Sequence, residues 1–442
     1  MKGKVYLESL GCPKNLVDSE VIAGYLKESG YTFTTCKEKA DIIIVNTCAF
    51  IKDATQEAID TIFELAELKK VGLCKKLVIA GCLPQRYGEQ LIHELKEVDL
   101  FIGVGEFPRI GELLEEERAE NSPPPLHISA PTFLLNHTTP RILATPTYTA
   151  YVKIAEGCSH HCSFCTIPKI KGPYQSRPAE SITAEVKKLA SQGVKEINLI
   201  AQDTTFYGKD LTNKTDLVYL LKQLSPINGI EWIRVLYCHP DHLSPDLITI
   251  MREEEKICNY IDLPLQHISD PILKRMGRGK DSTTIKKLIA KLRRDIPNLF
   301  LRTTLMVGFP GEEEKDFNLL MDFVKETAFE HLGAFRYSNE EGTRAYRFKG
   351  KVPDEVIEER YHTLMSTQSR ISLKNNQRLI GSQQRVLIEG FNKETSMPFG
   401  RTFFQAPDID EIVYIEKGNA AVGEMVEVKI TDASEYDLFA KI

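Results

Sequence analysis

The sequence predicts an α/β protein in three parts: a doubly wound parallel α/β domain, a partial barrel of six strand-helix units, and a small all-β barrel. Three observations predict this class. Short apolar runs rich in β-branched residues alternate with amphipathic stretches through residues 1–117 and again through 148–375. A proline-rich segment, 118–147, separates the two series and is expected to be a linker. Residues 376–442 contain short alternating runs that are typical of strands.

Each expected strand is short and bounded by turn or cap residues. In the first domain the helix that follows Asp53 is expected to be capped by Asp53 and Gln56, with Ile59, Ile62, Phe63 and Ala66 on one face. The expected strands are 5–9, 41–45, 77–80 and 101–104 in the first domain, 151–154, 196–200, 232–236, 260–263, 300–307 and 332–337 in the second, and 384–389, 412–415 and 425–430 in the third.

The composition is that of a globular protein, with 42% hydrophobic and 27% charged residues and a net charge of −6. A basic excess, the usual mark of nucleic-acid or anionic-membrane binding, is absent. The chain shows no signal-peptide pattern and no apolar run of roughly 18 residues, so we expect a cytoplasmic protein without a membrane span. Its ten cysteines would be reduced there, and grouped cysteines then indicate metal ligands or catalytic thiols.

The cysteines Cys158, Cys162 and Cys165 directly follow the first expected barrel strand. Thiolates at this spacing can ligate three irons of a cubane 4Fe–4S cluster and leave the fourth iron open for a substrate. The alternative is a zinc site that His160 or His161 would complete. Without zinc, both histidines are interpreted as solvated loop residues.

Three further cysteines, Cys12, Cys48 and Cys82, each stand at or just after the end of an expected strand of the first domain. Because parallel strands end at one edge of a sheet, the three thiols are expected to meet there and to form a second three-ligand site. The alternative is that buried cysteines act as small hydrophobic residues. We accept that interpretation for the remaining four cysteines, Cys36, Cys74, Cys238 and Cys258.

With an aromatic residue before Cys165 and all six cysteines in place, the chain resembles the radical S-adenosylmethionine (SAM) methylthiotransferases over nearly its whole length. The resemblance implies an N-terminal methylthiotransferase domain (1–117), a radical SAM core (148–375) and a TRAM domain (376–442). It implies two 4Fe–4S clusters and SAM as cofactors, and a low-potential electron donor such as flavodoxin or ferredoxin. One SAM would methylate sulfur bound at the first cluster, and a second SAM would supply the radical that abstracts hydrogen, so no general base is needed.

Residues 9–20 and 401–410 are most similar to the branch of this family that adds a methylthio group to the β-carbon of an aspartate in small-subunit ribosomal protein twelve. Gln405 stands where an acidic residue is expected, and Asn339 where proline is usual. The resemblance also implies SAM contacts, although each of these residues has an alternative role in packing or capping. They are Phe164, Arg177, Gln202, Asp203, Gln266, Gly308 and Tyr337.

The charge of the C-terminal segment bears on the substrate. From Asn376 to Ile442 the chain has seven Lys and Arg against eleven Asp and Glu, a net charge of −4. Such a segment favours a basic protein partner over the phosphate backbone of tRNA, unless the excess is merely a solvated face. A tRNA adenosine methylthiotransferase is the nearest alternative function, and a non-enzymatic iron-sulfur or zinc protein is the second.

Overall fold

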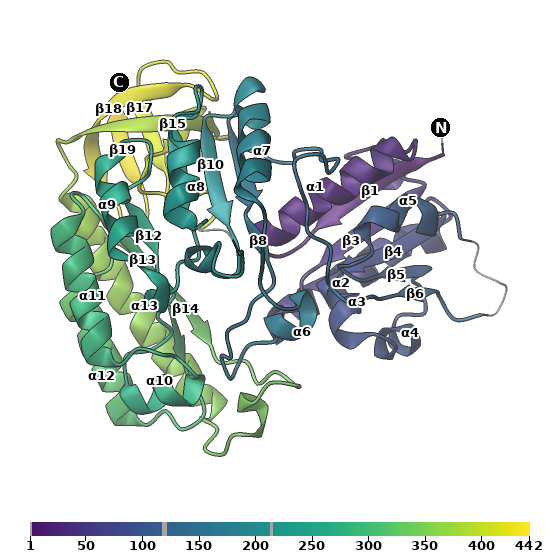
Figure 1. Cartoon of the computed structure of the whole chain (residues 1–442), viewed down its shortest axis with the longest axis horizontal. Helices are drawn as coiled ribbons and strands as arrows, with labels where there is room; N and C mark the ends of the chain where they lie inside the picture. The colour runs from purple at the N-terminus through teal and green to yellow at the C-terminus, as the bar shows by residue number, and fades with distance from the viewer. Residues whose placement is uncertain (1, 117–121, 213–214) are drawn as a thin grey trace.

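The computed structural model describes residues 2–116, 122–212 and 215–442 (Figure 1). The elements of its first part are β1 (Lys4–Ser9), α1 (Pro13–Glu28), β2 (Thr32–Phe33), β3 (Ile42–Thr47), α2 (Lys52–Lys70), β4 (Lys76–Gly81), α3 (Cys82–Tyr87), α4 (Gln90–Glu94), β5 (Leu100–Ile102), α5 (Ile110–Leu113) and β6 (Leu126–His127). Its strands form one parallel sheet in the order β2-β1-β3-β4-β5-β6. The strand order reverses beside β1, and such a switch point is where loops at the carboxyl edge diverge and leave room for a site.

The second part is an open barrel of parallel strands with helices outside. Its elements are β7 (Thr149–Lys153), β8 (Ala155–Glu156), α6 (Ile167–Lys171), β9 (Gln175–Ser176), α7 (Ala179–Ser191), β10 (Glu196–Ile200), α8 (Leu217–Leu224), β11 (Trp232–Val235), α9 (Pro245–Glu253), β12 (Tyr260–Asp262), α10 (Asp270–Met276), α11 (Ser282–Asp295), β13 (Phe300–Val307), α12 (Glu314–Thr327), β14 (His331–Arg336) and α13 (Asp354–Gln377). Strands β7, β10 and β11 form one sheet and β12, β13 and β14 another. A parallel bridge between Ile233 and Ile257 joins them.

The third part is a closed five-stranded barrel in the order β15-β16-β17-β19-β18, with bounds β15 (Gln383–Phe391), β16 (Pro398–Arg401), β17 (Val413–Lys417), β18 (Met425–Ala433) and β19 (Leu438–Lys441). It packs against the N-terminal ends of the central barrel strands (Figure 1). Glu196, at the start of β10, is fully buried between Arg401 at 2.7 Å and Arg234 at 3.0 Å. The hydroxyl of Tyr260 in β12 donates to Asp410 over 2.6 Å. The small barrel therefore covers this end of the central barrel and leaves the other end for the site.

Buried ion pairs join the first domain to the central barrel. Arg141, in the connecting segment, donates to Glu20 of α1 over 2.7 Å and to Glu185 of α7 over 2.6 Å. Asp18 of α1 binds the ammonium groups of Lys153 and Lys171 in the central part. Breaking a buried pair of this kind is strongly destabilising, so the two domains are held in one relative position.

Several details differ from the sequence-based expectations. The expected linker contributes β6, which pairs in parallel with β5 as the sixth strand of the sheet. The two-residue strand β2 was not predicted either. Helix α2 begins at Lys52 after Ile51, so the expected cap by Asp53 and Gln56 is wrong, and Phe63 is exposed. Strands β8, β9, β16 and β19 are also missing from the expected strands. The two-residue strands β2, β6, β8 and β9 are too short to show an alternating pattern. No helix among the described residues has the length and apolar character that crossing a bilayer requires.

Candidate active site

The first cysteine triad lies at the carboxyl edge of the N-terminal sheet. Cys12 follows β1 as the N-cap of α1, Cys48 follows β3, and Cys82 begins α3 directly after β4. Gly11 has a φ of +93°, and a Cβ at this position would lie 2.5 Å from the Cβ of Cys48. The loop of Cys12 therefore approaches Cys48 as closely as only glycine permits.

Hydrogen bonds from Asn15 fix the loops that carry this triad. Its side-chain amide donates to the carbonyl oxygens of Leu10 over 2.8 Å and Thr47 over 3.0 Å. Its Oδ1 lies 3.7 Å from the Sγ of Cys82, within reach of the thiol as donor. One buried side chain thus connects the segments after β1, β3 and β4 and keeps their three thiols at one place.

The second triad lies in the loop that leaves β7 and β8 at the mouth of the central barrel. The backbone N–H of Cys158 donates to Gly172 over 3.0 Å, and Ser163 donates its N–H to Met276 over 2.8 Å. The Nη1 of Arg278 lies 3.7 Å from the Sγ of Cys162. The loop is therefore held at its first cysteine and in its middle by the surrounding barrel.

Burial dominates the electrostatics of the thiols. It raises the pKa of Cys82 and of Cys165 to about 12, and that of Cys158 to about 11. Within each triad the neighbouring thiols raise these pKa values further, because thiolates repel one another. A cationic iron cluster reverses this balance, since metal binding stabilises the thiolates. Three converging thiols in buried surroundings fit a cubane cluster that is bound by three cysteines.

Both triads open onto a single cavity of about 390 Å³ at the carboxyl ends of the barrel strands. The N-terminal domain supplies one side of its lining and the barrel supplies the other. The thiols that line the cavity are Cys12, Cys48, Cys82, Cys158, Cys162 and Cys165. Cys36 and Cys74 do not line it, whereas the buried Cys238 lies at its wall.

Three of the seven predicted SAM contacts line this cavity: Phe164, Gln202 and Gln266. Phe164 lies between the second and third cysteines of the loop, as its position in the sequence requires. Gln202 follows β10, and Gln266 follows β12 with a φ of +74°. Their placement agrees with the role proposed from the sequence, which stays a prediction.

Three other predicted contacts lie outside the residues that line the cavity. The Arg177 guanidinium is fully buried and donates to the carbonyl oxygen of Lys153 over 2.6 Å. Gly308 has a φ of +80°, and a Cβ there would lie 2.4 Å from Ile357, so its close neighbour is helix α13. The Tyr337 ring packs in an apolar cluster that also contains Phe164. The sequence motifs indicate a role beside a ligand for each, whereas the structure shows each in packing or ion pairing.

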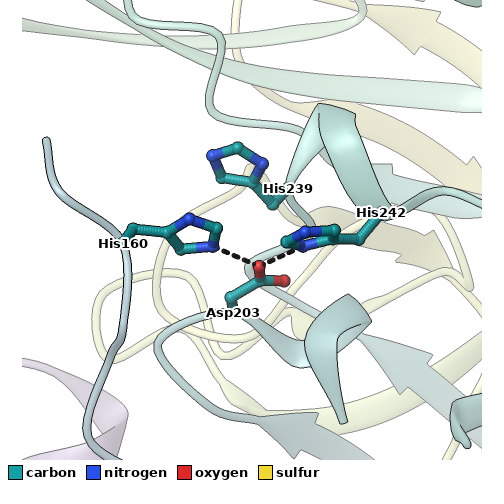
Figure 2. A group of neighbouring side chains, drawn as sticks. All are labelled: His160, Asp203, His239 and His242. Atoms are coloured by element: carbon teal, nitrogen blue, oxygen red, sulfur yellow. Dashed lines mark hydrogen bonds and ion pairs between the residues drawn. The ribbon is translucent and has the colours of Figure 1, made fainter. Parts of the chain in front are cut away.

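The seventh predicted contact, Asp203, belongs to a cluster with three histidines (Figure 2). Its Oδ2 lies 2.7 Å from both His160 Nε2 and His242 Nδ1. Burial alone would raise the pKa of Asp203, but hydrogen bonds from the two histidines lower it well below its usual value. His160 is therefore an anchor of the cysteine loop, and its interpretation as a solvated residue is wrong.

The ring geometry of this cluster favours hydrogen bonding over metal binding. The candidate ligand atoms lie within 4.8 Å of one another. However, the rings of His160 and His239 are stacked, with centroids 4.2 Å apart and planes 12° apart (Figure 2). Imidazole lone pairs lie in the ring plane, so two nearly parallel rings cannot direct them at one ion. The cluster ties the loop of residues 158–165 to the ends of β10 and β11.

Sequence reasoning missed the cations at the cavity. Lys171 is paired with Asp18 at 2.7 Å. Arg278 donates to the carbonyl oxygen of Pro264 over 2.7 Å. Lys14 places its Nζ 3.2 Å from the centroid of the Tyr237 ring. Lys14 appeared only within the motif of residues 9–20, and its distance from Tyr237 in the sequence gave no signal of their contact.

Family models and solved structures agree with this architecture. The models that match are Uncharacterized protein family UPF0004 (residues 4–103), Radical SAM superfamily (152–324) and TRAM domain (380–442). The radical SAM methyltransferase TsrM from Kitasatospora setae is 15% identical with a TM-score of 0.55, covering 75% of this chain and 72% of that chain. The cobalamin-dependent SAM radical enzyme OxsB is 14% identical with a TM-score of 0.53, covering 84% of this chain and 56% of that chain. They confirm the predicted fold class.

Relatives that match over the full length of the chain identify its family. Two proteins named ribosomal protein uS12 methylthiotransferase RimO, from Geotalea uraniireducens and Geobacter sulfurreducens, are 51% identical over 443 residues and cover 100% of this chain and 99% of their own. A protein of the same name from Myxococcus xanthus is 49% identical and covers 99% of this chain and 91% of its own. The chain belongs to the RimO family of radical SAM methylthiotransferases.

Proposed function

We propose that this protein is a cytoplasmic enzyme that adds a methylthio group to the β-carbon of an aspartate in ribosomal protein uS12. The observation that carries the proposal is the single cavity that all six predicted ligand cysteines line. Insertion of sulfur into a C–H bond needs a sulfur source and a radical source within reach of one carbon atom. Two thiol triads on one cavity provide a site for each, and the names of the full-length relatives support the substrate.

We assign a 4Fe–4S cluster to each triad, one in the N-terminal domain (1–117) and one in the core (148–375), with 376–442 as the TRAM domain. SAM would bind beside the cluster of the core, where Phe164, Gln202 and Gln266 line the cavity. When bound, these groups supply an activated methylthio sulfur and a carbon-centred radical. The fit rests on the donor set: each site brings three thiols to the wall of the cavity, and a cubane cluster held by three cysteines would leave its fourth iron open.

The side chains of the protein hold these groups and exclude water. Asn15 fixes the three loops of the first triad, and Asp203 fixes the cysteine loop of the second through His160. The apolar residues of the cavity wall, among them Phe50 and Ile170, limit the access of solvent to a reactive radical. No side chain is required to move a proton, because the bond to the β-carbon is broken by transfer of a hydrogen atom.

The partners follow from this chemistry. A low-potential protein such as flavodoxin or ferredoxin would supply the electrons. The net charge of −4 on residues 376–442 supports a basic protein substrate and disfavours tRNA.

The test is a product assay with anaerobically reconstituted enzyme, SAM and reductant. Purified uS12 and bulk tRNA are supplied in separate reactions, and each product is weighed by mass spectrometry. A gain of one methylthio group on the uS12 aspartate supports the proposal. Methylthio adenosine in tRNA would replace it with the alternative function, and a colourless preparation that contains zinc would remove the enzyme class altogether.

A further inference from the structure

Lys14 is a buried cation without an anionic partner. Its side chain projects from the first turn of α1 into the cavity, and the residue is 8% exposed. Among the residues that the structure describes, no carboxylate forms an ion pair with its ammonium. Its close contact is the face of the Tyr237 ring, 3.2 Å from Nζ to the centroid.

The other two cationic side chains that line the cavity have polar partners within the protein. Lys171 has the carboxylate of Asp18, and Arg278 has the carbonyl oxygen of Pro264. Burial removes an ammonium group from water, and contact with one aromatic face compensates for only part of the lost hydration. The Lys14 site is therefore incomplete, and an anion that enters the cavity would complete it.

The backbone beneath Lys14 is strained. Tyr237 has a φ of +59°, which is rare and unfavourable for a bulky residue. Two hydrogen bonds hold this conformation: its N–H donates to Asp262 over 2.9 Å, and its carbonyl oxygen accepts from the N–H of Thr204 over 3.0 Å. Gln266, also on the cavity wall, has a φ of +74°. Such strain persists where the surroundings enforce it, and here it presents the ring to the ammonium.

We propose that Lys14, resting on the Tyr237 ring, binds the side-chain carboxylate of the substrate aspartate and so positions its β-carbon. The inference rests on the proposed function. In an aspartate side chain the carboxylate is bonded directly to the β-carbon, so holding one fixes the distance of the other from both triads. Lys14 lies two residues after Cys12, in the first turn of α1, and so belongs to the domain that carries the first triad. This places the carboxylate beside the sulfur source.

SAM also carries a carboxylate, so the test separates the two sources. The protein is reconstituted with both clusters and kept without reductant, so that no turnover occurs. Dissociation constants are measured for uS12, for uS12 with the target aspartate replaced by asparagine, and for SAM alone. The enzymes are wild type, Lys14→Met, Tyr237→Leu and, as a matched control, Lys187→Met, which removes an exposed lysine of α7.

We expect wild type and Lys187→Met to bind the aspartate form about 10- to 100-fold more tightly than the asparagine form, the usual worth of a charge-assisted hydrogen bond. Lys14→Met should bind both forms equally, at the level of wild type with asparagine. Tyr237→Leu should reduce the preference for aspartate. The affinity for SAM and the iron content should be unchanged in Lys14→Met.

Three results would overturn the inference. Wild type could fail to distinguish aspartate from asparagine, an outcome that does not depend on how any variant folds. Lys14→Met could keep the preference. Lys14→Met could instead weaken SAM binding or lose iron, which would make Lys14 a cofactor residue. Failure of the proposed function is a different result, because wild-type enzyme with reductant would then leave uS12 unmodified.

Discussion

The Nε2 of His160 and the Oδ2 of Asp203 lie 2.7 Å apart, and this contact joins the loop of the core cysteines to the end of strand β10. Asp203 also lies 2.7 Å from His242 Nδ1 and accepts a hydrogen bond from Thr205. The carboxylate thus accepts hydrogen bonds from three side chains, those of His160, His242 and Thr205. It orients a loop whose two flanking thiols, those of Cys158 and Cys162, belong to the same proposed cluster.

Replacing Asp203 by Asn should impair the radical half of the reaction. The uncharged amide oxygen is a weaker acceptor for the two histidines than the carboxylate, and the amide NH2 would face the Thr205 hydroxyl and the Phe206 N–H, which are both donors. The His160 anchor therefore weakens. We expect formation of 5′-deoxyadenosine to fall about 10- to 100-fold, as is typical for residues that orient metal ligands. Asp246→Asn, at an exposed aspartate of α9, is the control. A rate equal to wild type would show that the loop holds its position without Asp203.

Mutation should separate the functions of the two cysteine triads. A variant with Cys12, Cys48 and Cys82 all changed to Ala should retain about four of the about eight irons of wild type. It should still cleave SAM reductively but transfer no methylthio group. The corresponding variant of the core cysteines should also keep about half of the iron but cleave no SAM. Iron analysis and chromatography of 5′-deoxyadenosine check both, and iron loss in equal steps from every single variant would contradict the assignment.

Gly11→Ala tests the approach of the Cys12 loop to Cys48. The new Cβ would lie 2.5 Å from the Cβ of Cys48, at a φ of +93°. Gly193→Ala is a matched control, because Gly193 has a φ of +97° but no neighbouring atom within 4 Å of the added carbon. Both variants carry the cost of the backbone conformation, of order 1–3 kcal/mol. Only Gly11→Ala should also lose iron from the first site, and equal iron contents would argue against the close approach.

Glu196→Gln should weaken the attachment of the small C-terminal barrel to the central barrel. It leaves Arg234 buried without its anion and removes one of the two carboxylates that pair with Arg401, the other being Glu389 at 2.7 Å. Breaking a buried ion pair typically costs about 3–5 kcal/mol. We expect a lower free energy of unfolding at pH 7, measured with urea on the apoprotein. A loss below about 1 kcal/mol would contradict the role of this carboxylate.

The same residue predicts a pH dependence. Burial alone would raise the pKa of Glu196, but Arg401 and Arg234 lower it from 4.5 to about 2. Because the folded pKa is depressed, this stabilisation is present above pH 4.5 and is lost as the pH falls toward 2. Wild-type apoprotein should therefore lose more stability over this interval than Glu196→Gln. Parallel pH profiles for the two proteins would contradict the pairing.

Local sequence pattern predicted the parts of the molecule that depend on strand ends. Parallel strands end at one edge, so the positions of Cys12, Cys48 and Cys82 relative to their strands were enough to predict that the three thiols meet. The three-part order of the chain followed in the same way from alternating apolar runs. The two-residue strands β2, β6, β8 and β9 could not be predicted, because pairing with a neighbour defines them rather than a pattern of their own.

Contacts between segments that lie far apart in the sequence could not be predicted. Asp203 follows a strand end and was expected beside SAM, but its partners His239 and His242 come from the next strand-helix connection, and their direction depends on tertiary packing. Lys14 and Tyr237 are 223 positions apart by their numbers, and only the docking of the first domain brings them together. Side chains that meet across a domain boundary carry no periodic signal.

The ion pairs of Arg141 with Glu20 and Glu185 join the first domain to the central barrel, and they have a consequence for assembly of the active site. Each set of thiols comes from one domain alone, so each domain would hold its proposed cluster without a ligand from the other. The cavity that both triads line forms only when the two domains are docked. Loss of these ion pairs would give an enzyme that holds both proposed clusters and cleaves SAM but does not transfer the methylthio group.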